Sequence, residues 1–210
     1  MEKILLRTVL QQKILPAVSI TSIEQALPVA EAILKGGLNV MEVPFRTNVA
    51  PEAISVIRKN FPEMYVGAGT LLSPEQLGMA MASGAQFGLS PGLNPSVCRN
   101  ALDNDFPFIP GVMSPSEIEL AAEMNFMILK LFPAAQLDGT RFLKAVLEAY
   151  GHLQIQFIPM GGVSMTNIPD YLNLKNVIAV GGSWLTTKDI IAAGAFDKIS
   201  SQVREALLKT

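Results

Sequence analysis

The sequence predicts an α/β protein, a (β/α)8 TIM barrel made of one domain over residues 1–210 with an additional helix at its N-terminus. Short apolar runs alternate with amphipathic stretches eight times along the chain. A turn rich in glycine, proline, serine or threonine follows most of the runs, and no linker or low-complexity tract interrupts the series. This pattern is typical of parallel strands joined by helices. An open doubly wound sheet is the structural alternative, because counting units does not prove that the sheet closes.

The expected elements follow one another at intervals of roughly twenty residues, as βα units require. Residues 1–13 are expected to form the extra helix, which covers the bottom of the barrel, and residues 187–209 the last helix. The apolar runs predict strands at 15–20, 40–43, 65–68, 86–89, 107–110, 126–131, 155–158 and 177–180.

Helix starts are recognisable between these strands. Ser73 and Ser114 each stand before a proline, a combination that places a capping residue before the first helical position. Ser22 precedes another helical stretch, and Thr47 or Asn48 is expected to open the helix that runs through residues 51–57.

Composition excludes several classes of function. The net charge of −2 and the lack of any Lys/Arg cluster argue against a nucleic-acid partner. No apolar run reaches membrane-spanning length, and charges interrupt the first residues too often for a signal peptide, so we expect a cytoplasmic protein with no membrane partner. A single cysteine, Cys98, and a single histidine, His152, cannot build a usual metal site, so no metal or cofactor is expected. His152 also precedes a strand, the wrong end for a catalytic triad in this fold.

Lys130 is the most informative residue, because it interrupts the apolar run 126–131. Alternation along a strand places it on the same side as Ile128 and Phe126. An ammonium among such neighbours is poorly solvated, which favours the neutral, nucleophilic amine of Schiff-base catalysis. The structural alternative is a lysine whose stem covers apolar surface while its ammonium reaches water.

Further polar residues and glycines stand at the carboxyl ends of the other predicted strands. Ligands of parallel α/β proteins bind at the carboxyl ends of the strands. Glu42 is a candidate general base, although a structural pair with Arg46 is the alternative. Arg46 suits a substrate carboxylate, and Thr70 can add a hydrogen bond. Glycine turns at Gly161–Gly162 and Gly182–Ser183 follow the last two strands, where barrel enzymes often bind phosphate.

Taken together, these motifs resemble the bacterial class I aldolases for 2-keto-3-deoxy-6-phosphogluconate (KDPG) and 4-hydroxy-2-oxoglutarate (KHG). The resemblance runs from about Leu15 to Thr186. It is carried by Leu15-Pro-Ala-Val, Met41-Glu-Val-Pro-Phe-Arg-Thr47, Val66-Gly-Ala-Gly-Thr70, Leu89-Ser-Pro-Gly92, Phe108-Ile-Pro-Gly111, Leu129-Lys-Leu-Phe-Pro-Ala134, Pro159-Met-Gly-Gly-Val-Ser164 and Gly181-Gly-Ser-Trp184.

The resemblance implies a Schiff-base role for Lys130 and an acid/base role for Glu42. It implies a trimer of barrels, a 2-keto acid substrate and a place in the Entner–Doudoroff pathway. The pyruvate end of the substrate would contact Arg46, Thr70 and Pro91, and its phosphate end would contact Gly161, Gly162, Gly182 and Ser183.

One residue departs from the family pattern. Members often carry threonine before the Gly161–Gly162 pair, and this chain has Met160. Losing that hydroxyl can change the preference between KDPG and KHG.

Two other functions stay open at this point. A phosphosugar epimerase or another non-imine enzyme would keep the phosphate turns on the same barrel. A catalytically silent barrel that binds a small molecule is the other alternative.

Overall fold

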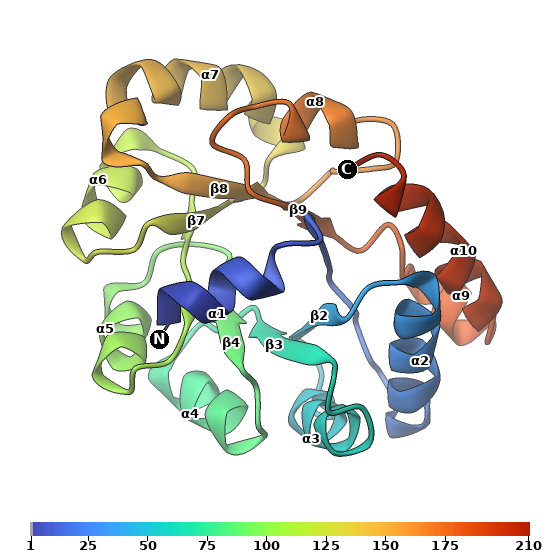
Figure 1. Cartoon of the computed structure of the whole chain (residues 1–210). Helices are drawn as coiled ribbons and strands as arrows, with labels where there is room; N and C mark the ends of the chain where they lie inside the picture. The colour runs from blue at the N-terminus through green and yellow to red at the C-terminus, as the bar shows by residue number, and fades with distance from the viewer. Residues whose placement is uncertain (1) are drawn as a thin grey trace.

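The computed structural model describes residues 2–210, in which nine short strands are surrounded by helices (Figure 1). The strands are β1 Ile14–Pro16, β2 Val40–Pro44, β3 Tyr65–Gly69, β4 Phe87–Leu89, β5 Phe108–Ile109, β6 Gly111–Val112, β7 Ile128–Leu131, β8 Gln156–Pro159 and β9 Val180–Gly182. The α-helices are α1 Glu2–Val9, α2 Ala26–Gly36, α3 Ala50–Asn60, α4 Pro74–Ala82, α5 Pro95–Asp103, α6 Pro115–Glu123, α7 Gly139–Tyr150, α8 Ile168–Leu172, α9 Lys188–Ala192 and α10 Phe196–Leu207. Single 3-10 turns lie at Ile23–Gln25, Ala135–Leu137 and Gly151–Leu153.

The strands are parallel and form a closed barrel, as predicted. Strands β2 to β5 pair in chain order, strands β6 to β8 do the same, and β1 pairs with β9. Isolated bridges from Ala17 to Glu42 and from Met160 to Gly181 join β1 to β2 and β8 to β9. The ring therefore has no open edge, and the open-sheet alternative is wrong.

The fifth barrel position differs from the expected strand 107–110. It consists of β5, which pairs with β4, and β6, which pairs with β7. Pro110 stands between them, and a proline has no N–H to donate to the ladder. Its carbonyl still accepts a hydrogen bond from the backbone N–H of Lys130 (2.9 Å). One strand position is thus shared by two short segments.

Two apolar clusters follow from the alternation of side chains along the strands. The larger cluster lies between the strands and the surrounding helices. The smaller one fills the interior of the barrel, and includes Val40, Leu89, Ile109, Ile128 and Ile158.

Helix α1 closes one end of this interior, as expected for an extra helix at the bottom. Leu6 and Val9 of α1, and Leu10 directly after it, belong to the interior cluster, each at most 4% exposed. Figure 1 shows α1 crossing the middle of the ring of strands. Burying each such side chain contributes about 1.5–3 kcal/mol, so these contacts hold α1 in place.

Several predicted boundaries are wrong. The helix expected over 187–209 is two helices, α9 and α10, because the chain turns at Gly194, which has a φ of +64°. The first strand ends at Pro16 rather than at residue 20. The last strand is Val180–Gly182 rather than 177–180, since Gly181 and Gly182 pair with Leu15 and Pro16.

The predicted helix starts are confirmed at two places. The hydroxyls of Ser73 and Ser114 accept hydrogen bonds from backbone N–H groups of the first turns of α4 and α6. Helix α3 begins after Val49, so the expected cap at Thr47 or Asn48 is wrong. The Thr47 hydroxyl instead donates to the carbonyl of Ile20 (2.7 Å), which ties the loop after β2 to the loop after β1. No helix in residues 2–210 combines the length and apolar character needed to cross a membrane.

Cys98 lies in α5 with no exposed surface, and this burial raises the pKa of its thiol to about 11. The folded state therefore holds the thiol proton more tightly than the unfolded chain between about pH 9 and 11. The contribution of the Cys98 thiol to the stability of the folded state is complete below this pH range and is lost as the pH rises through the range. We expect the free energy of unfolding of the Cys98→Ala variant to fall less over this interval than that of the natural chain, by about 2 kcal/mol.

Urea unfolding of both proteins at several pH values measures this difference. Parallel loss of stability in the two proteins would contradict the assignment to Cys98. Below about pH 8, Cys98 of the folded protein should also react slowly with thiol reagents, because the nucleophile is the thiolate.

Candidate functional site

The candidate site is a cavity of about 430 Å³ at the carboxyl ends of the strands. Its lining comes from segments far apart in the sequence, which the barrel brings together. These residues are Ala17, Glu42, Pro44, Arg46, Thr70, Pro91, Lys130, Phe132, Met160, Gly161, Gly162, Val163, Gly182, Ser183, Trp184 and Thr187.

All the residues predicted to form the site line this one cavity. Glu42 and Lys130 project from β2 and β7, and the remaining candidates follow strand ends or, for Gly182, end a strand. The structure therefore brings together what the sequence pattern only placed at successive strand ends.

Lys130 and Glu42 point into the barrel because of strand alternation. Lys130 lies two residues after Ile128, and Glu42 two residues after Val40, and both of these apolar residues belong to the interior cluster. The predicted neighbour Phe126 is not on this face. It precedes β7 and packs edge-to-face on Phe108 in the outer cluster.

The Lys130 amine and the Glu42 carboxylate face each other across the cavity. Nζ of Lys130 lies 4.0 Å from Oε1 of Glu42, and the two residues are 5% and 1% exposed. This distance is too long for a direct hydrogen bond. The other oxygen of Glu42, Oε2, is buried and has no hydrogen-bond partner within the described part of the chain. A buried acceptor left open in this way is costly unless a bound molecule uses it.

Both structural alternatives for these residues are contradicted. The Lys130 side chain is only 6% exposed and lines the interior cavity, so it does not cover an outer apolar surface. Among the described residues, Glu42 forms no ion pair with Arg46. Arg46 is exposed at the rim of the cavity, where its guanidinium is free to meet an anion.

Phe132 is a site residue that the sequence analysis missed. Its ring centroid lies 5.2 Å from Nζ of Lys130, within range of a cation–π interaction. The sequence could have indicated Phe132, because a residue two positions after Lys130 in a strand lies on the same side of the chain. Thr187 was also missed. Its hydroxyl caps α9 by accepting a hydrogen bond from the N–H of Ile190.

Gly69 makes room for the Glu42 carboxylate. A Cβ built on Gly69 would overlap Oε1 of Glu42, so any larger residue would displace the carboxylate. Thr70 follows with a φ of +57°, a conformation that is strained for a β-branched residue and is often found at functional sites. The end of β3 is therefore shaped around Glu42.

The loop after β8 presents its backbone to the cavity. Gly161 and Gly162 have φ values of +84° and +81°, which other residues adopt only with strain. A Cβ on Gly162 would also overlap the side chain of Ala135. Met160 is buried at 3% exposure and packs into the interior cluster, with its methyl group close to Gly181. The thioether thus fills space beneath the loop.

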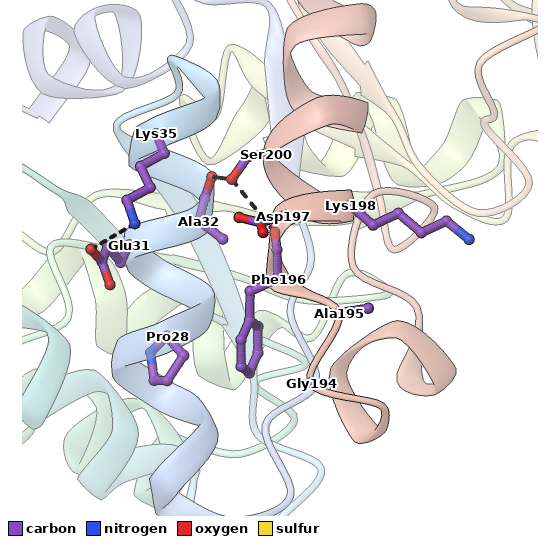
Figure 2. A pocket seen from close by; sticks show the side chains of 10 residues that line it. All are labelled: Pro28, Glu31, Ala32, Lys35, Gly194, Ala195, Phe196, Asp197, Lys198 and Ser200. Atoms are coloured by element: carbon purple, nitrogen blue, oxygen red, sulfur yellow. Dashed lines mark hydrogen bonds and ion pairs between the residues drawn. The ribbon is translucent and has the colours of Figure 1, made fainter.

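A second hollow, of about 370 Å³, lies between α2 and α10 on the outer layer of the molecule (Figure 2). Lys35 forms an ion pair there with Glu31 (3.0 Å), and the Ser200 hydroxyl donates to the carbonyl of Ala32 (2.8 Å). Because these groups bind one another and lie outside the barrel, this hollow is not the candidate active site.

Comparison with known proteins gives one consistent match. The family model described as KDPG and KHG aldolase matches residues 6–202. A relative from Haemophilus influenzae, named 2-dehydro-3-deoxy-phosphogluconate aldolase, is 41% identical over 93% of this chain and 91% of its own length. A relative from Escherichia coli K12, named KHG/KDPG aldolase, is 40% identical over 92% of this chain and 90% of its own length.

Solved structures agree with these relatives. One of them is KDPG aldolase from Legionella pneumophila, with pyruvate captured at low pH as a covalent carbinolamine intermediate. It is 36% identical to this chain with a TM-score of 0.91, and the match covers 94% of this chain and 96% of the Legionella pneumophila chain. The enzyme from Zymomonas mobilis with 3-phosphoglycerate is 33% identical with a TM-score of 0.89, covering 97% and 95%.

Proposed function

The chain belongs to the KDPG and KHG aldolase family, and from this premise we propose that it cleaves KDPG to pyruvate and glyceraldehyde 3-phosphate, and KHG to pyruvate and glyoxylate, through an imine on Lys130. The observation that carries the proposal is the Lys130 amine buried 4.0 Å from the Glu42 carboxylate in one cavity. This constellation, together with the family, favours a class I aldolase over a non-imine epimerase or a silent binding protein.

The reaction begins at Nζ of Lys130. The uncharged amine attacks the 2-keto carbon, giving a carbinolamine that loses water to form an iminium ion. A carbinolamine of pyruvate is the species named for the Legionella pneumophila enzyme. Arg46 binds the substrate carboxylate at the rim, and Thr70 and Pro91 form the wall at the pyruvate end.

Glu42 then moves the protons. Its carboxylate takes the proton of the C4 hydroxyl, directly or through one water molecule, and the C3–C4 bond breaks with its electrons flowing into the iminium ion. An aldehyde leaves and an enamine remains on Lys130. Protonation at C3 and hydrolysis of the imine release pyruvate and restore the amine.

The distal phosphate of KDPG would be bound by the backbone N–H groups at Gly161–Gly162 and Gly182–Ser183. Consecutive glycines with positive φ allow the backbone to approach an anion closely. Met160 supplies no hydroxyl for this end of the substrate. The proposed backbone N–H contacts, without a side-chain hydroxyl, are compatible with both the phosphorylated KDPG and the shorter KHG.

A cleavage assay of KDPG and KHG side by side, coupled to pyruvate detection, tests the substrate range. We expect turnover of both substrates. A preference of more than about 100-fold for one of them would restrict the proposal to that substrate, since a single binding contact accounts for differences of this order. Release of pyruvate from neither would refute it.

We expect Gly69→Ala to slow cleavage by at least about 100-fold, because the added Cβ displaces the Glu42 carboxylate. Borohydride reduction with pyruvate should still label Lys130, since Lys130 itself is not touched. Gly78→Ala is the matched control. Nothing lies within 4 Å of a Cβ at Gly78, and alanine in this helix should stabilise the fold by about 1 kcal/mol. Equal activity of the two variants would show that Gly69 does not position Glu42.

For the whole protein we propose a cytoplasmic homotrimer of one-domain barrels, with the partners limited to small 2-keto acids. The support is the family resemblance and a set of large apolar side chains that this one chain leaves exposed. They include Leu72, Met79 and Met113, each about half exposed. Sedimentation equilibrium should give three times the chain mass of 22.6 kDa, and a monomer at micromolar concentration would contradict the trimer.

A further inference from the structure

A third cavity, of about 600 Å³, lies at the amino-terminal ends of the strands, opposite the candidate active site. It is formed by α1, the end of α7, the start of β8 and the turn that leads to β9. The residues that line it are Arg7, Leu147, Gly151, Gln154, Ile155, Gln156, Lys175 and Asn176. None of them belongs to the catalytic cavity.

The charged groups of this lining are all positive. Arg7 and Lys175 carry the charge, and no Asp or Glu among the described residues lines the cavity. Neither cation has a hydrogen bond or ion pair with another residue of the part of the chain that the structure describes. Two unpaired cations beside one cavity make the local potential positive, although the net charge of the chain is −2.

Buried amides beside these cations lack partners of their own. Asn176 is 6% exposed, and neither Nδ2 nor Oδ1 has a hydrogen bond with any residue that the structure describes. Oε1 of Gln156 is also buried without a partner. Residues of this one cavity thus carry three of the six such atoms identified in residues 2–210. Open buried polar groups are costly and call for an explanation, such as a ligand.

The position of Asn176 is fixed by the backbone. Its carbonyl accepts a hydrogen bond from the N–H of Phe157 (2.7 Å), which ties the turn before β9 to β8. The adjacent N–H, of Val177, donates to the carbonyl of Leu174 (2.9 Å). The amide is therefore held beside the cavity by the barrel itself rather than by a loose loop.

We propose that this cavity binds a small hydroxylated anion, a carboxylate or a phosphate ester that also carries hydroxyl groups. The anionic oxygens would meet Arg7 and Lys175, whose N–H groups donate charge-assisted hydrogen bonds. The amide side chains of Gln156 and Asn176 line the same cavity, and on binding they would turn to pair their open oxygen and nitrogen atoms with the ligand's hydroxyl groups. Because Arg7 lies on α1, the bound anion would also fasten this helix to the barrel.

Isothermal titration with gluconate and, separately, with glycerol 2-phosphate tests the site and distinguishes the two anion types. The variant Arg7→Gln/Lys175→Gln removes both cations, and we expect at least about a tenfold weaker affinity for the probe that binds. The matched control is Arg141→Gln/Lys144→Gln, which removes one arginine and one lysine from exposed positions of α7 and should leave the affinity unchanged. Asn176→Leu, which keeps the side-chain volume, should weaken binding as well.

Thermal unfolding gives an independent readout, because a ligand of the folded state raises the midpoint. The probe should raise the midpoint of the natural chain and of the α7 control more than that of Arg7→Gln/Lys175→Gln. In the absence of probe, the aldolase activity of Arg7→Gln/Lys175→Gln should be unchanged, which would show that the proposed anion site is separate from catalysis.

Failure of both probes to bind the natural chain at millimolar concentration would overturn the proposal. Equal weakening in the two double variants would overturn it too, because it would show only a general effect of charge. Probe binding that survives the loss of Arg7 and Lys175 would assign the anion to the catalytic cavity and would also refute the site.

Discussion

Replacing Lys130 by methionine should reduce pyruvate release from both substrates to the uncatalysed background. Methionine keeps most of the volume of the side chain in the buried cavity but has no amine, so neither the carbinolamine nor the iminium ion can form. Lys130 also contacts the Phe132 ring and faces Glu42, yet no other lysine of the described residues lines the cavity to take over its role. The measurement is the coupled cleavage assay at saturating substrate.

Lys144→Met is the control for this variant, because Lys144 is exposed on α7 and should tolerate the change at full activity. Circular dichroism and thermal unfolding should show that Lys130→Met folds, since it exchanges a buried polar amine for an apolar group of similar volume. Cleavage by Lys130→Met within about tenfold of the natural rate would place the nucleophile elsewhere.

Glu42→Gln should slow cleavage by about 10²–10⁴-fold, the range for loss of a positioned proton-transfer group. Glutamine is nearly isosteric and still fits above Gly69, but its amide cannot take the C4 hydroxyl proton. Since attack by Lys130 does not require this proton transfer, borohydride should still trap pyruvate on the variant. The pair of readouts therefore separates proton transfer from imine formation.

The control for this change is Glu63→Gln, at an exposed position before β3, which should keep its full rate. Loss of both cleavage and trapping in Glu42→Gln would mean that the carboxylate is needed to form the imine rather than to break the carbon–carbon bond. Unchanged cleavage would remove Glu42 from the mechanism.

The sequence predicted the barrel because each βα unit carries its own local signals. Apolar runs, proline-led helix starts and glycine turns recur without interruption, and only a closed or doubly wound parallel sheet accommodates eight such units. Side-chain alternation correctly predicted that Lys130 lies on the same face as Ile128. The positions of the other site residues at strand ends correctly predicted that they lie together at the carboxyl end of the barrel. These features depend on periodicity, which local sequence contains.

Features that depend on contacts between distant segments were not predictable in this way. The split of the fifth strand at Pro110 depends on the different partners of β5 and β6. The sequence predicted a turn at Gly181 and Gly182, but these residues pair with β1 and so extend the last strand. The fit of the Glu42 carboxylate above Gly69 arises across two neighbouring strands. No local pattern contains that information.

The arrangement also separates chemistry from selectivity. The groups proposed to make and break bonds, Lys130 and Glu42, stand on strands β7 and β2, where barrel packing fixes them. The groups proposed for the phosphate end belong to Gly161–Gly162 and to Gly182–Ser183. Substitutions such as Met160 at the end of β8 can therefore alter substrate preference without disturbing the imine chemistry.

The most direct test of the central claim is borohydride reduction of the natural protein in the presence of pyruvate, followed by peptide mass spectrometry. The proposed mechanism predicts a single carboxyethyl group on the peptide that contains Lys130, and no such group without pyruvate or in Lys130→Met. An intact protein that releases pyruvate from KDPG yet gains no adduct, or gains it at a different lysine, would contradict the mechanism.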